Sequence, residues 1–323
     1  MRDVARAADV SVATVSYVMN DTGSVGELVR ARVRQVAEEL GYRPNQSAKA
    51  MRTGRSQTLG LILPDLRNPF FAEVAQAVQM TARQAGYAVI LVDSGEDVAA
   101  EREGADDLVR YGVDGIIWCP SSNTDSLAAH RGHLPITVVA RPLAGYDAVA
   151  SDYEAGGAIL ADFLVAQGYP SVAIISGPQS LSSARFRRDG FISRLAGRLP
   201  IAWEVENAFS VELGPQVRAR LLRGDAAAIV CGNDLIAIGA IRTLIEAGIR
   251  VPEDAAVLGY DDIPWAGILM PSLTTIHQAL DTLGREAVDL LMRRIDNRSA
   301  PELQRKLPVA LVTRRSTAGQ RQS

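Results

Sequence analysis

Short apolar runs of strand length alternate with helical stretches along most of the chain beyond Gln57. The runs occupy residues 58–63, 87–92, 115–119 and 135–139, and the cycle restarts near Ala148 with runs at 172–176, 226–231 and 255–258. Helical stretches separate them, at residues 70–85, 98–111, 125–130, 182–195, 214–222, 235–247 and 280–295. Short apolar runs separated by helices are typical of parallel strands buried on both faces. The pattern predicts an α/β core of two doubly wound parallel-sheet subdomains, with ligands bound at the carboxyl ends of the strands.

Composition excludes several classes of protein. The 323 residues are 47% apolar and 22% charged, which suits about two globular domains. The two cysteines, Cys119 and Cys231, lie far apart in apolar segments, so neither a disulfide framework nor a CxxC metal or redox site is expected. Three histidines alone cannot supply a zinc-rich site, and we expect no metal or cofactor. No apolar run approaches the ~20 residues of a membrane span, and residues 1–10 carry two Arg and two Asp where a secretion signal is apolar. We therefore expect a cytoplasmic protein with no membrane partner.

Charge is distributed unevenly along the chain. Residues 1–55 hold nine cations and six anions, a balance of +3, so the remainder carries −6 of the total of −3. A small basic head on an acidic body suggests that the head contacts a polyanion. A chance excess of three charges on a solvated helix surface explains the same balance equally well.

The first 44 residues are predicted to form a three-helix unit. A first helix at 3–8 is followed by a break at Asp9, a residue type that tolerates the left-handed backbone of a tight turn. Ser11 stands where it can cap a second helix at 12–19, whose buried face is predicted to be Val15, Val18 and Met19. A third helix is predicted at 27–40, ending at Gly41. Its inward-facing residues are predicted to be Leu28, Val33, Val36, Ala37 and Leu40. This is the arrangement of a helix-turn-helix, whose second helix enters a major groove by its N-terminal end.

Several strings in this unit resemble the DNA-binding head of the lactose-repressor family: DVA at 3–5, VSVATVS at 10–16, Asn20, and GYRPN at 41–45. The resemblance implies operator DNA as a partner, with Val12, Ala13 and Tyr17 reading bases and Thr14 and Ser16 contacting phosphate. Asn20 belongs to the same implied DNA-binding set. Many relatives carry Arg or His in place of Tyr17, so a different base preference is expected there. Relatives usually begin with a Thr that caps the first helix, so either the first turn here is less well capped or the true start lies upstream of Met1.

Residues 45–56 form a polar linker, which composition alone describes as a flexible connector. The resemblance implies instead a segment that folds as a helix on the operator. In that role Met51 would be the apolar wedge inserted between base pairs in the minor groove. Ala48 would allow close approach, and Lys49 and Arg52 would contact the DNA backbone.

Polar and aromatic side chains gather where the predicted strands end. Aromatic rings with Asn, Arg, Asp and Gln suit a polyhydroxylated ring, because apolar faces sandwich the ring while polar groups bind its hydroxyls. Residues 58–314 resemble the sugar-binding core that the family shares with the periplasmic ribose-binding proteins. That resemblance implies a core of periplasmic-binding-protein type and a ligand site made of Asn68, Phe70, Phe71, Arg141, Arg187, Phe209, Asn233, Asp261 and Gln278, with Cys119 and Tyr153 at its margin.

Two departures from the sugar-binding pattern bear on the ligand. Ala140 stands where related sugar binders often carry Asp, and Tyr153 replaces an expected Asn. Both changes remove partners for hydroxyl groups, so ribose itself is not the expected ligand. Each site residue also has a structural interpretation. Phe70 and Phe71 suit a core, Arg187 a surface ion pair, and Asn233 a helix cap.

The domain boundaries follow from these segments. We expect a head at 1–44, the linker at 45–56, and a core at 57–314 followed by a polar tail at 315–323. The first subdomain is expected at about 57–147 and 279–307, and the second at about 148–278 and 308–314. The tail lacks leucine heptads, so a homodimer is expected and a coiled-coil tetramer is not.

The function that these patterns favour is a homodimeric transcriptional repressor controlled by a sugar or polyol effector. A purine- or nucleoside-responsive repressor is the alternative within the same family. A nucleotide-dependent enzyme is less consistent, because residues 64–68 read PDLRN where a GxGxxG motif would follow the first core strand, and no catalytic residue is expected. A transport binding protein would need a secretion signal and would lack the basic head.

Overall fold

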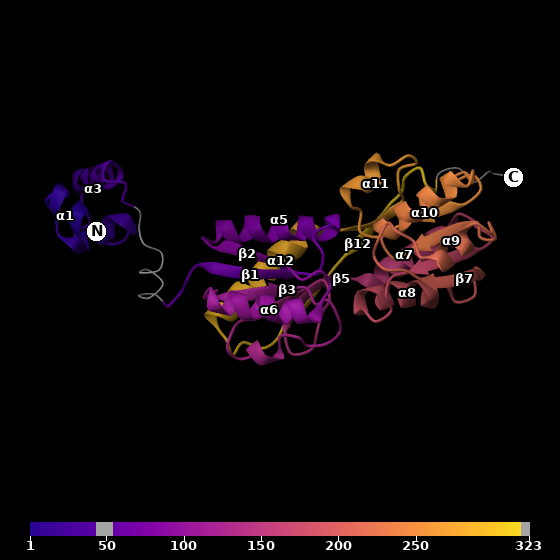
Figure 1. Cartoon of the computed structure of the whole chain (residues 1–323), viewed down its shortest axis with the longest axis horizontal. Coiled ribbons are helices and arrows are strands. Elements are labelled where there is room, and N and C mark those ends of the chain that lie inside the picture. The colour runs from indigo at the N-terminus through magenta and orange to yellow at the C-terminus, as the bar shows by residue number, and fades with distance from the viewer. Residues whose placement is uncertain (43–53, 318–323) are drawn as a thin grey trace. The chain divides into compact units, whose positions relative to one another are not determined.

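The computed structural model describes residues 1–42 and 54–317, which divide into two compact units, Met1–Gln57 and Thr58–Ser323 (Figure 1). Each unit has its own apolar core, so each is described separately.

The N-terminal unit is a three-helix bundle of α1 (Arg2–Ala8), α2 (Val12–Met19) and α3 (Glu27–Glu39). Asp9 adopts the left-handed conformation, with φ 54° and ψ 50°, and this permits the sharp turn between α1 and α2. The Ser11 side chain accepts a 3.0 Å hydrogen bond from the backbone N–H of Thr14, so the expected N-cap of α2 is confirmed. Met1 occupies the N-cap position of α1 and makes no side-chain capping hydrogen bond.

The buried face of α3 differs from the expectation. Val33 and Ala37 are buried, but Leu28 is 89% exposed and Leu40 is 52% exposed, so their inward assignment was wrong. Leu28 lies five residues before Val33, which at 3.6 residues per turn places it well off the buried stripe. Leu40 is the C-cap residue, beyond the last turn of α3.

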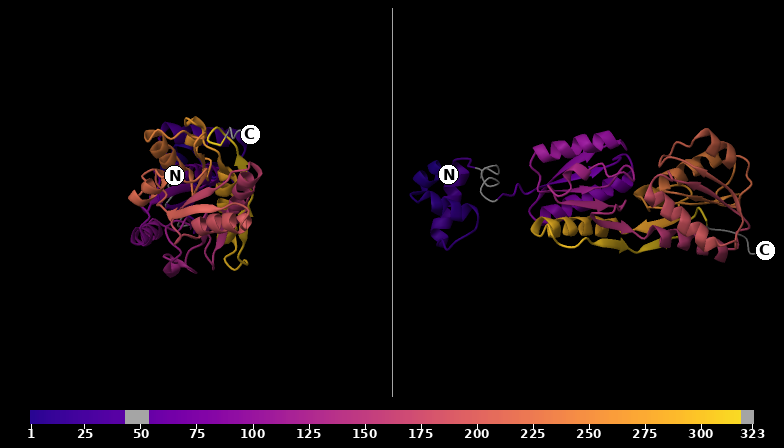
Figure 2. Two further views of the ribbon diagram at one scale, coloured as in Figure 1. Left: turned by 90° about the vertical axis from the view of Figure 1, so that its right-hand side faces the viewer. Right: turned by 90° about the horizontal axis from the view of Figure 1, so that it is seen from below.

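The first core subdomain is built on a six-stranded parallel sheet in the order β11-β5-β4-β3-β1-β2. Its strands are β1 (Thr58–Leu63), β2 (Ala88–Asp93), β3 (Gly115–Trp118), β4 (Ile136–Val139), β5 (Asp147–Ser151) and β11 (Gln304–Leu307). Helices α5 (Pro69–Gln84) and α12 (Leu280–Asp296) pack on one face, and α6 (Val98–Arg110) packs on the other (Figure 2). The sheet is therefore covered on both sides, as its apolar strands require.

The second core subdomain contains a four-stranded parallel sheet in the order β7-β6-β8-β9. Its strands are β6 (Val172–Ser176), β7 (Ile201–Glu206), β8 (Ala228–Cys231) and β9 (Ala256–Leu258). Helices α7 (Tyr153–Ala166) and α8 (Ser182–Leu195) cover one face, and α9 (Pro215–Leu221) and α10 (Asp234–Glu246) cover the other. A short α11 (Pro264–Ile268) follows β9, and β10 (Thr275–Gln278) pairs antiparallel with β12 (Val309–Val312).

Three connections join the two subdomains: β5 to α7, β10 to α12, and β11 to β12. The first connection lies after Ser151 rather than near Ala148, because residues 147–151 pair with β4 and β11 in the first sheet.

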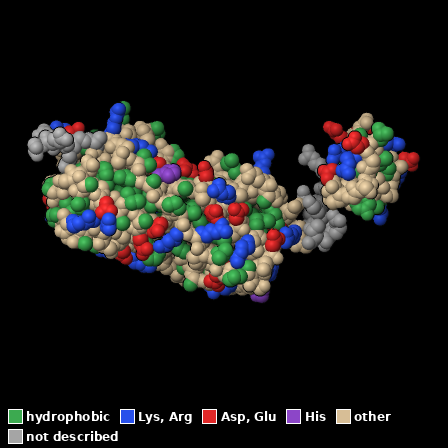
Figure 3. Space-filling model, turned by 180° about the vertical axis from the view of Figure 1, so that it is seen from behind, with side chains coloured by type: hydrophobic (Ala, Val, Ile, Leu, Met, Phe, Trp, Pro, Cys, Tyr) green, Lys and Arg blue, Asp and Glu red, His purple; other side chains and the backbone are tan. Residues whose placement is uncertain are grey.

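The prediction of a helix at residues 125–130 is wrong, since the structure forms only a 3-10 turn at Ala128–His130. Positively and negatively charged side chains are intermixed on the face of the core that Figure 3 shows.

Among residues 1–42 and 54–317 no helix is both long and apolar enough to cross a membrane. The same part of the chain holds no group of three or more His, Cys, Asp and Glu side chains placed to bind a metal ion.

Candidate effector pocket and DNA-reading helix

A small cavity lies between the two core subdomains, beyond the carboxyl ends of strands from both sheets. It encloses about 20 Å³ and is lined by Asn68, Phe70, Phe71, Ala140, Arg141, Tyr153, Ser183, Arg187, Phe209, Asn233 and Asp261. A volume of that size holds about one water molecule. A larger ligand therefore requires the lining side chains or the two subdomains to move apart.

The N-terminal end of α5 forms one wall of this pocket. The Asn68 side chain caps α5 by accepting a 3.1 Å hydrogen bond from the N–H of Phe70. That cap orients Phe70 and Phe71, whose rings pack edge to face with centroids 5.1 Å apart. Both rings belong to the apolar core of the first subdomain and also line the cavity, so the structural interpretation is confirmed and the ligand-binding interpretation stays a prediction.

Arg141 lines the pocket from the second position after the end of β4. It is 4% exposed, and its Nη1 donates a 2.7 Å hydrogen bond to the carbonyl of Pro120. Its guanidinium carbon lies 5.6 Å from the centroid of the Phe71 ring. Ala140, just before it, has a φ of 63°, a left-handed conformation that alanine adopts only at a cost.

Arg187 on α8 is the central cation of the opposite wall. Its Nη2 lies 3.0 Å from the Asp261 carboxylate, and its Nη1 donates to the Gly232 carbonyl at 2.8 Å. Its guanidinium carbon also lies 4.0 Å from the Tyr260 ring centroid and 4.9 Å from that of Tyr153. Arg187 is only 8% exposed, so it is not a surface ion pair.

Close packing of two helices brings Arg187 and Tyr153 together. A Cβ placed on Gly157 of α7 would lie 2.2 Å from the Arg187 carbonyl of α8. Such a distance is far below a normal contact, so the α7–α8 approach requires glycine at this position. Tyr153 is the first residue of α7, and its hydroxyl donates a 2.6 Å hydrogen bond to the Ala140 carbonyl of the first subdomain.

The Asp261 carboxylate is buried and held by three groups. Besides Arg187, the Gln278 Nε2 donates to it at 2.7 Å, and the Asn233 side chain also hydrogen-bonds it. Burial raises the pKa of Asp261 to about 6, although the neighbouring Arg187 acts in the opposite direction. The site therefore contains a carboxylate whose charge is costly and is retained by its partners.

Asn233 serves as the N-cap of α10, where its Oδ1 accepts a 3.0 Å hydrogen bond from the N–H of Ile236. It also lines the cavity, so its position is consistent with the predicted ligand-binding role as well. The adjacent Asp234 lies deeper and outside the lining, with its carboxylate bound by the Thr275 hydroxyl at 2.5 Å. Burial raises the pKa of Asp234 well above its usual value.

Nine of the eleven ligand-binding residues expected from the sequence line the cavity. Gln278 lies behind the wall and positions Asp261, while Cys119 lies in the core of the first subdomain, where burial raises the pKa of its thiol to about 12. Sequence reasoning missed Ser183 and did not assign Ala140 to the wall. Ser183 could have been found from its position one helical turn before Arg187.

The second helix of the N-terminal unit presents the residues expected to read DNA. Val12, Ala13 and Tyr17 are exposed, Thr14, Ser16 and Asn20 are half-buried, and the Asn20 Nδ2 donates to the Ser16 carbonyl at 2.7 Å. A Cβ on Gly23 would lie 3.1 Å from the Tyr17 ring, so this loop glycine packs against Tyr17. The expected linker contacts of Lys49, Met51 and Arg52 lie outside the described residues.

The excess positive charge of residues 1–55 lies in a shorter segment than the expected basic head. Residues 1–44 carry six cations and six anions, a balance of zero, whereas residues 45–56 carry three cations and no anion. In addition, Arg30 and Arg34 both pair with Asp21, at 2.7 Å and 2.6 Å. The excess positive charge therefore belongs to the linker and not to the three-helix unit.

Comparison with known proteins accounts for both parts of the chain. Residues 1–45 match the family model for bacterial regulatory proteins of the lacI family, and residues 161–317 match the periplasmic binding protein-like domain. The ribose operon repressor of Escherichia coli (strain K12) is 31% identical over 98% of this chain and 99% of its own length. The transcriptional repressor PurR of Pasteurella multocida (strain Pm70) is 33% identical over 98% of each chain.

The similarity to known proteins extends to solved three-dimensional structures. A crystal structure of the lac repressor dimer, bound to operator and the anti-inducer ONPF, superposes with a TM-score of 0.86 at 29% identity, covering 98% of each chain. The helix-turn-helix head and the two-subdomain core of this chain thus occur together in one known architecture. The chain belongs to the LacI family: it is a cytoplasmic DNA-binding transcriptional repressor with an effector-binding core, and it is not an enzyme.

Proposed function

We propose that this repressor is controlled by a sugar or related polyol that binds between the two core subdomains. The observation that carries the proposal is the pairing of aromatic and polar groups in the pocket. Phe70, Phe71 and Phe209 offer apolar ring faces, while Asn68 and Asn233 offer amides from opposite walls. Such a combination suits a ring with many hydroxyls, which need both stacking and directed hydrogen bonds.

Closure of the pocket provides the link to DNA binding. Ligand groups that touch both walls favour the closed arrangement over the open one, and only such differential binding can shift an equilibrium. The polypeptide enters the first subdomain at β1, directly after the linker. We propose that closure changes how the two linkers of a homodimer meet the operator.

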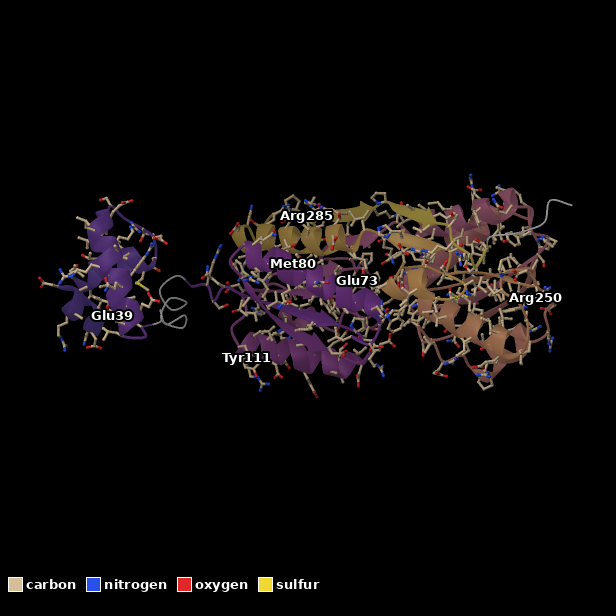
Figure 4. The ribbon with its side chains drawn as sticks, turned by 90° about the horizontal axis from the view of Figure 1, so that it is seen from above. Glu39, Glu73, Met80, Tyr111, Arg250 and Arg285 are labelled. Carbon is tan, nitrogen blue, oxygen red and sulfur yellow. The ribbon has the colours of Figure 1, made fainter. Side chains whose placement is uncertain are left out.

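A second copy of the chain is the partner expected for reading two half-sites. The core exposes large apolar side chains suited to such an interface, including Ile268 and Met270 after β9 and Met80 on the outer face of α5 (Figure 4). Met270→Lys should therefore shift the molecular mass measured by light scattering toward that of a monomer. An unchanged dimer would exclude Met270 from the interface, and a monomeric parent protein would remove the dimer proposal.

A purine or nucleoside effector is the second candidate. The relative named PurR is as similar to this chain as the ribose operon repressor is, and aromatic side chains also stack on bases. The two candidates differ in what the polar groups must bind, hydroxyls in one case and ring nitrogens in the other.

A thermal-shift screen of the full-length protein against sugars, polyols, purines and nucleosides separates the two candidates. A ligand that binds only the folded state raises the melting temperature by mass action. A shift with sugars or polyols supports the proposal, and a shift with purines alone would refute it. Each binder is then added to an operator-binding titration, where it must change the affinity for specific DNA.

The linker proposal is tested on DNA. We propose that Met51 is inserted into the minor groove, with Lys49 and Arg52 on the backbone, as the family resemblance implies. Met51→Ala should then weaken binding to the operator more than binding to random duplex DNA, because the unstacked step belongs to the specific complex. Equal losses on both would exclude the wedge.

A further inference from the structure

The charges that line the effector pocket do not balance. Two guanidinium groups, Arg141 and Arg187, and one carboxylate, Asp261, make up its charged lining. Asp261 is paired with Arg187 at 3.0 Å. Of the ion pairs formed by the described residues, none includes Arg141. The pocket therefore holds one buried positive charge without a counter-charge.

Glu101, a buried carboxylate of the first subdomain, does not supply the counter-charge. Glu101 of α6 is fully buried, but it accepts hydrogen bonds from the N–H of Ser121 and, at 2.6 Å, from the hydroxyl of Ser126. The described residues show no ion pair between Glu101 and Arg141. Among the described residues, the carbonyl of Pro120 is the acceptor of the hydrogen bond that Arg141 donates.

A guanidinium has five N–H donors in a planar fork that matches a carboxylate or a phosphate. With one donor used by Pro120, the remaining donors of Arg141 are available at the cavity wall. Burying a charge without a partner is costly, and a partner of opposite charge removes most of that cost. A neutral sugar would leave this cost in place, whereas an anionic ligand would remove it on binding.

The residue beside Arg141 supports the same conclusion. Ala140 has a φ of 63°, a conformation that Asp and Asn tolerate better than Ala. A carboxylate at position 140 would thus be compatible with the local backbone, yet the chain has a methyl group there. The lack of an internal counter-charge is a property of the side chains and is not imposed by the backbone.

We propose that the effector is an anionic sugar derivative, a sugar acid or a sugar phosphate, whose anionic group binds Arg141. The Arg187–Asp261 pair and the two asparagine amides then bind its hydroxyls. This inference rests on the proposed function, namely that the pocket takes a polyhydroxylated effector.

Matched ligand sets test the inference on the full-length protein. Calorimetric titrations compare D-glucose with D-gluconate and D-glucose 6-phosphate, and D-ribose with D-ribonate and D-ribose 5-phosphate. In at least one set an anionic member should bind at least about tenfold more tightly than its neutral parent, as a charge-assisted hydrogen bond is strong enough to do. Preference for the acid or for the phosphate identifies which anion Arg141 binds.

Three variants connect the preference to these residues. Arg141→Gln should lower the affinity for the anionic ligand by roughly tenfold to a hundredfold, and it should lower the affinity for the neutral parent sugar less. Ala140→Asp adds an internal carboxylate and should reduce or reverse the preference for the anion. Ala140→Asn is the matched control, because it suits the same backbone conformation without adding charge, and it should keep the preference.

The outcomes separate this inference from the proposed function. If a neutral sugar binds as tightly as its acid and its phosphate, the anionic effector is overturned and the polyol-controlled repressor remains. If only purines bind, both the anionic effector and the polyol-controlled repressor are overturned. If Ala140→Asp and Ala140→Asn change the preference equally, the assignment of the anion to Arg141 is overturned.

Discussion

The Tyr153 hydroxyl donates a 2.6 Å hydrogen bond to the carbonyl of Ala140, and this bond joins the two subdomains of the core. Tyr153 begins α7 of the second subdomain, and Ala140 follows β4 of the first. Both residues are buried, so water does not compete for either group. The bond can form only when the two walls of the pocket are close, and it therefore favours the closed arrangement.

Tyr153→Phe removes this bond and keeps the ring. We expect a loss of about 1 kcal/mol in stability, the usual net value of one hydrogen bond, and a weaker response of operator binding to the effector. Tyr169→Phe is the matched control, since the Tyr169 hydroxyl donates to the Thr317 carbonyl at 3.3 Å, away from the pocket lining. Thermal melts and effector titrations compare the two. Equal changes in effector affinity would show that the Tyr153 bond has no special part in closure.

Sequence patterns located the pocket because the carboxyl ends of parallel strands converge at one edge of a sheet. Asn68 and Asn233 both follow such strands and cap the next helix. The same asparagine therefore marks the start of a helix and a position at the edge of the pocket. The Tyr153–Ala140 bond could not be foreseen, because it joins elements whose relative placement depends on the whole core. The charge of Arg187 was visible in the sequence, but its burial between aromatic rings was not.

Other parts of the fold were missed for identifiable reasons. Strand β7, IAWEVE, alternates between exposed and buried positions at the sheet edge, unlike the continuous apolar runs that marked the other strands. Helix α7 contains Gly156 and Gly157 in a largely apolar stretch, which lowers helix propensity. Its close packing on α8, visible only in three dimensions, compensates for that cost.

Asp261 makes stability depend on pH in a defined direction. Its pKa rises from 3.8 in the unfolded chain to about 6 in the fold, so the folded protein binds the proton more tightly between these values. Its contribution to stability is therefore gained as the pH falls through this window and lost as the pH rises. Relative to Asp261→Asn, the parent protein should gain on the order of 2–3 kcal/mol between pH 7 and pH 4.

Chemical denaturation at several pH values measures this difference. Asp254→Asn is the control, because Arg250 lowers the pKa of Asp254 to about 2, and its removal should leave the slope between pH 5 and pH 7 unchanged. A pH-independent difference between the parent protein and Asp261→Asn would contradict the raised pKa of Asp261.

Tyr17 should determine which bases are read without stabilising the head. Its ring is half exposed and rests on Gly23, whereas Tyr42 packs against the head core. Tyr17→Ala is expected to change the preferred operator in selections from a randomised duplex library, with little change in the melting temperature. Tyr42→Ala should instead lower head stability, measured by limited proteolysis, and weaken binding to all sequences. An unaltered sequence preference in Tyr17→Ala would remove Tyr17 from the base-reading set.

Phosphate attraction should depend on the linker, since residues 1–44 carry a balance of zero and residues 45–56 carry +3. Each phosphate contact contributes a slope of about −0.9 to the dependence of log K on log salt concentration. Lys49→Gln in both chains of a dimer should therefore make the slope shallower by about 2. Lys306→Gln removes an exposed cation of the core, where it pairs with Glu154 at 3.3 Å, and should leave the slope unchanged. Filter-binding titrations between low and high salt measure both variants. If both slopes changed equally, the effect would come from overall charge, and the linker would lose its assigned role in holding the DNA backbone.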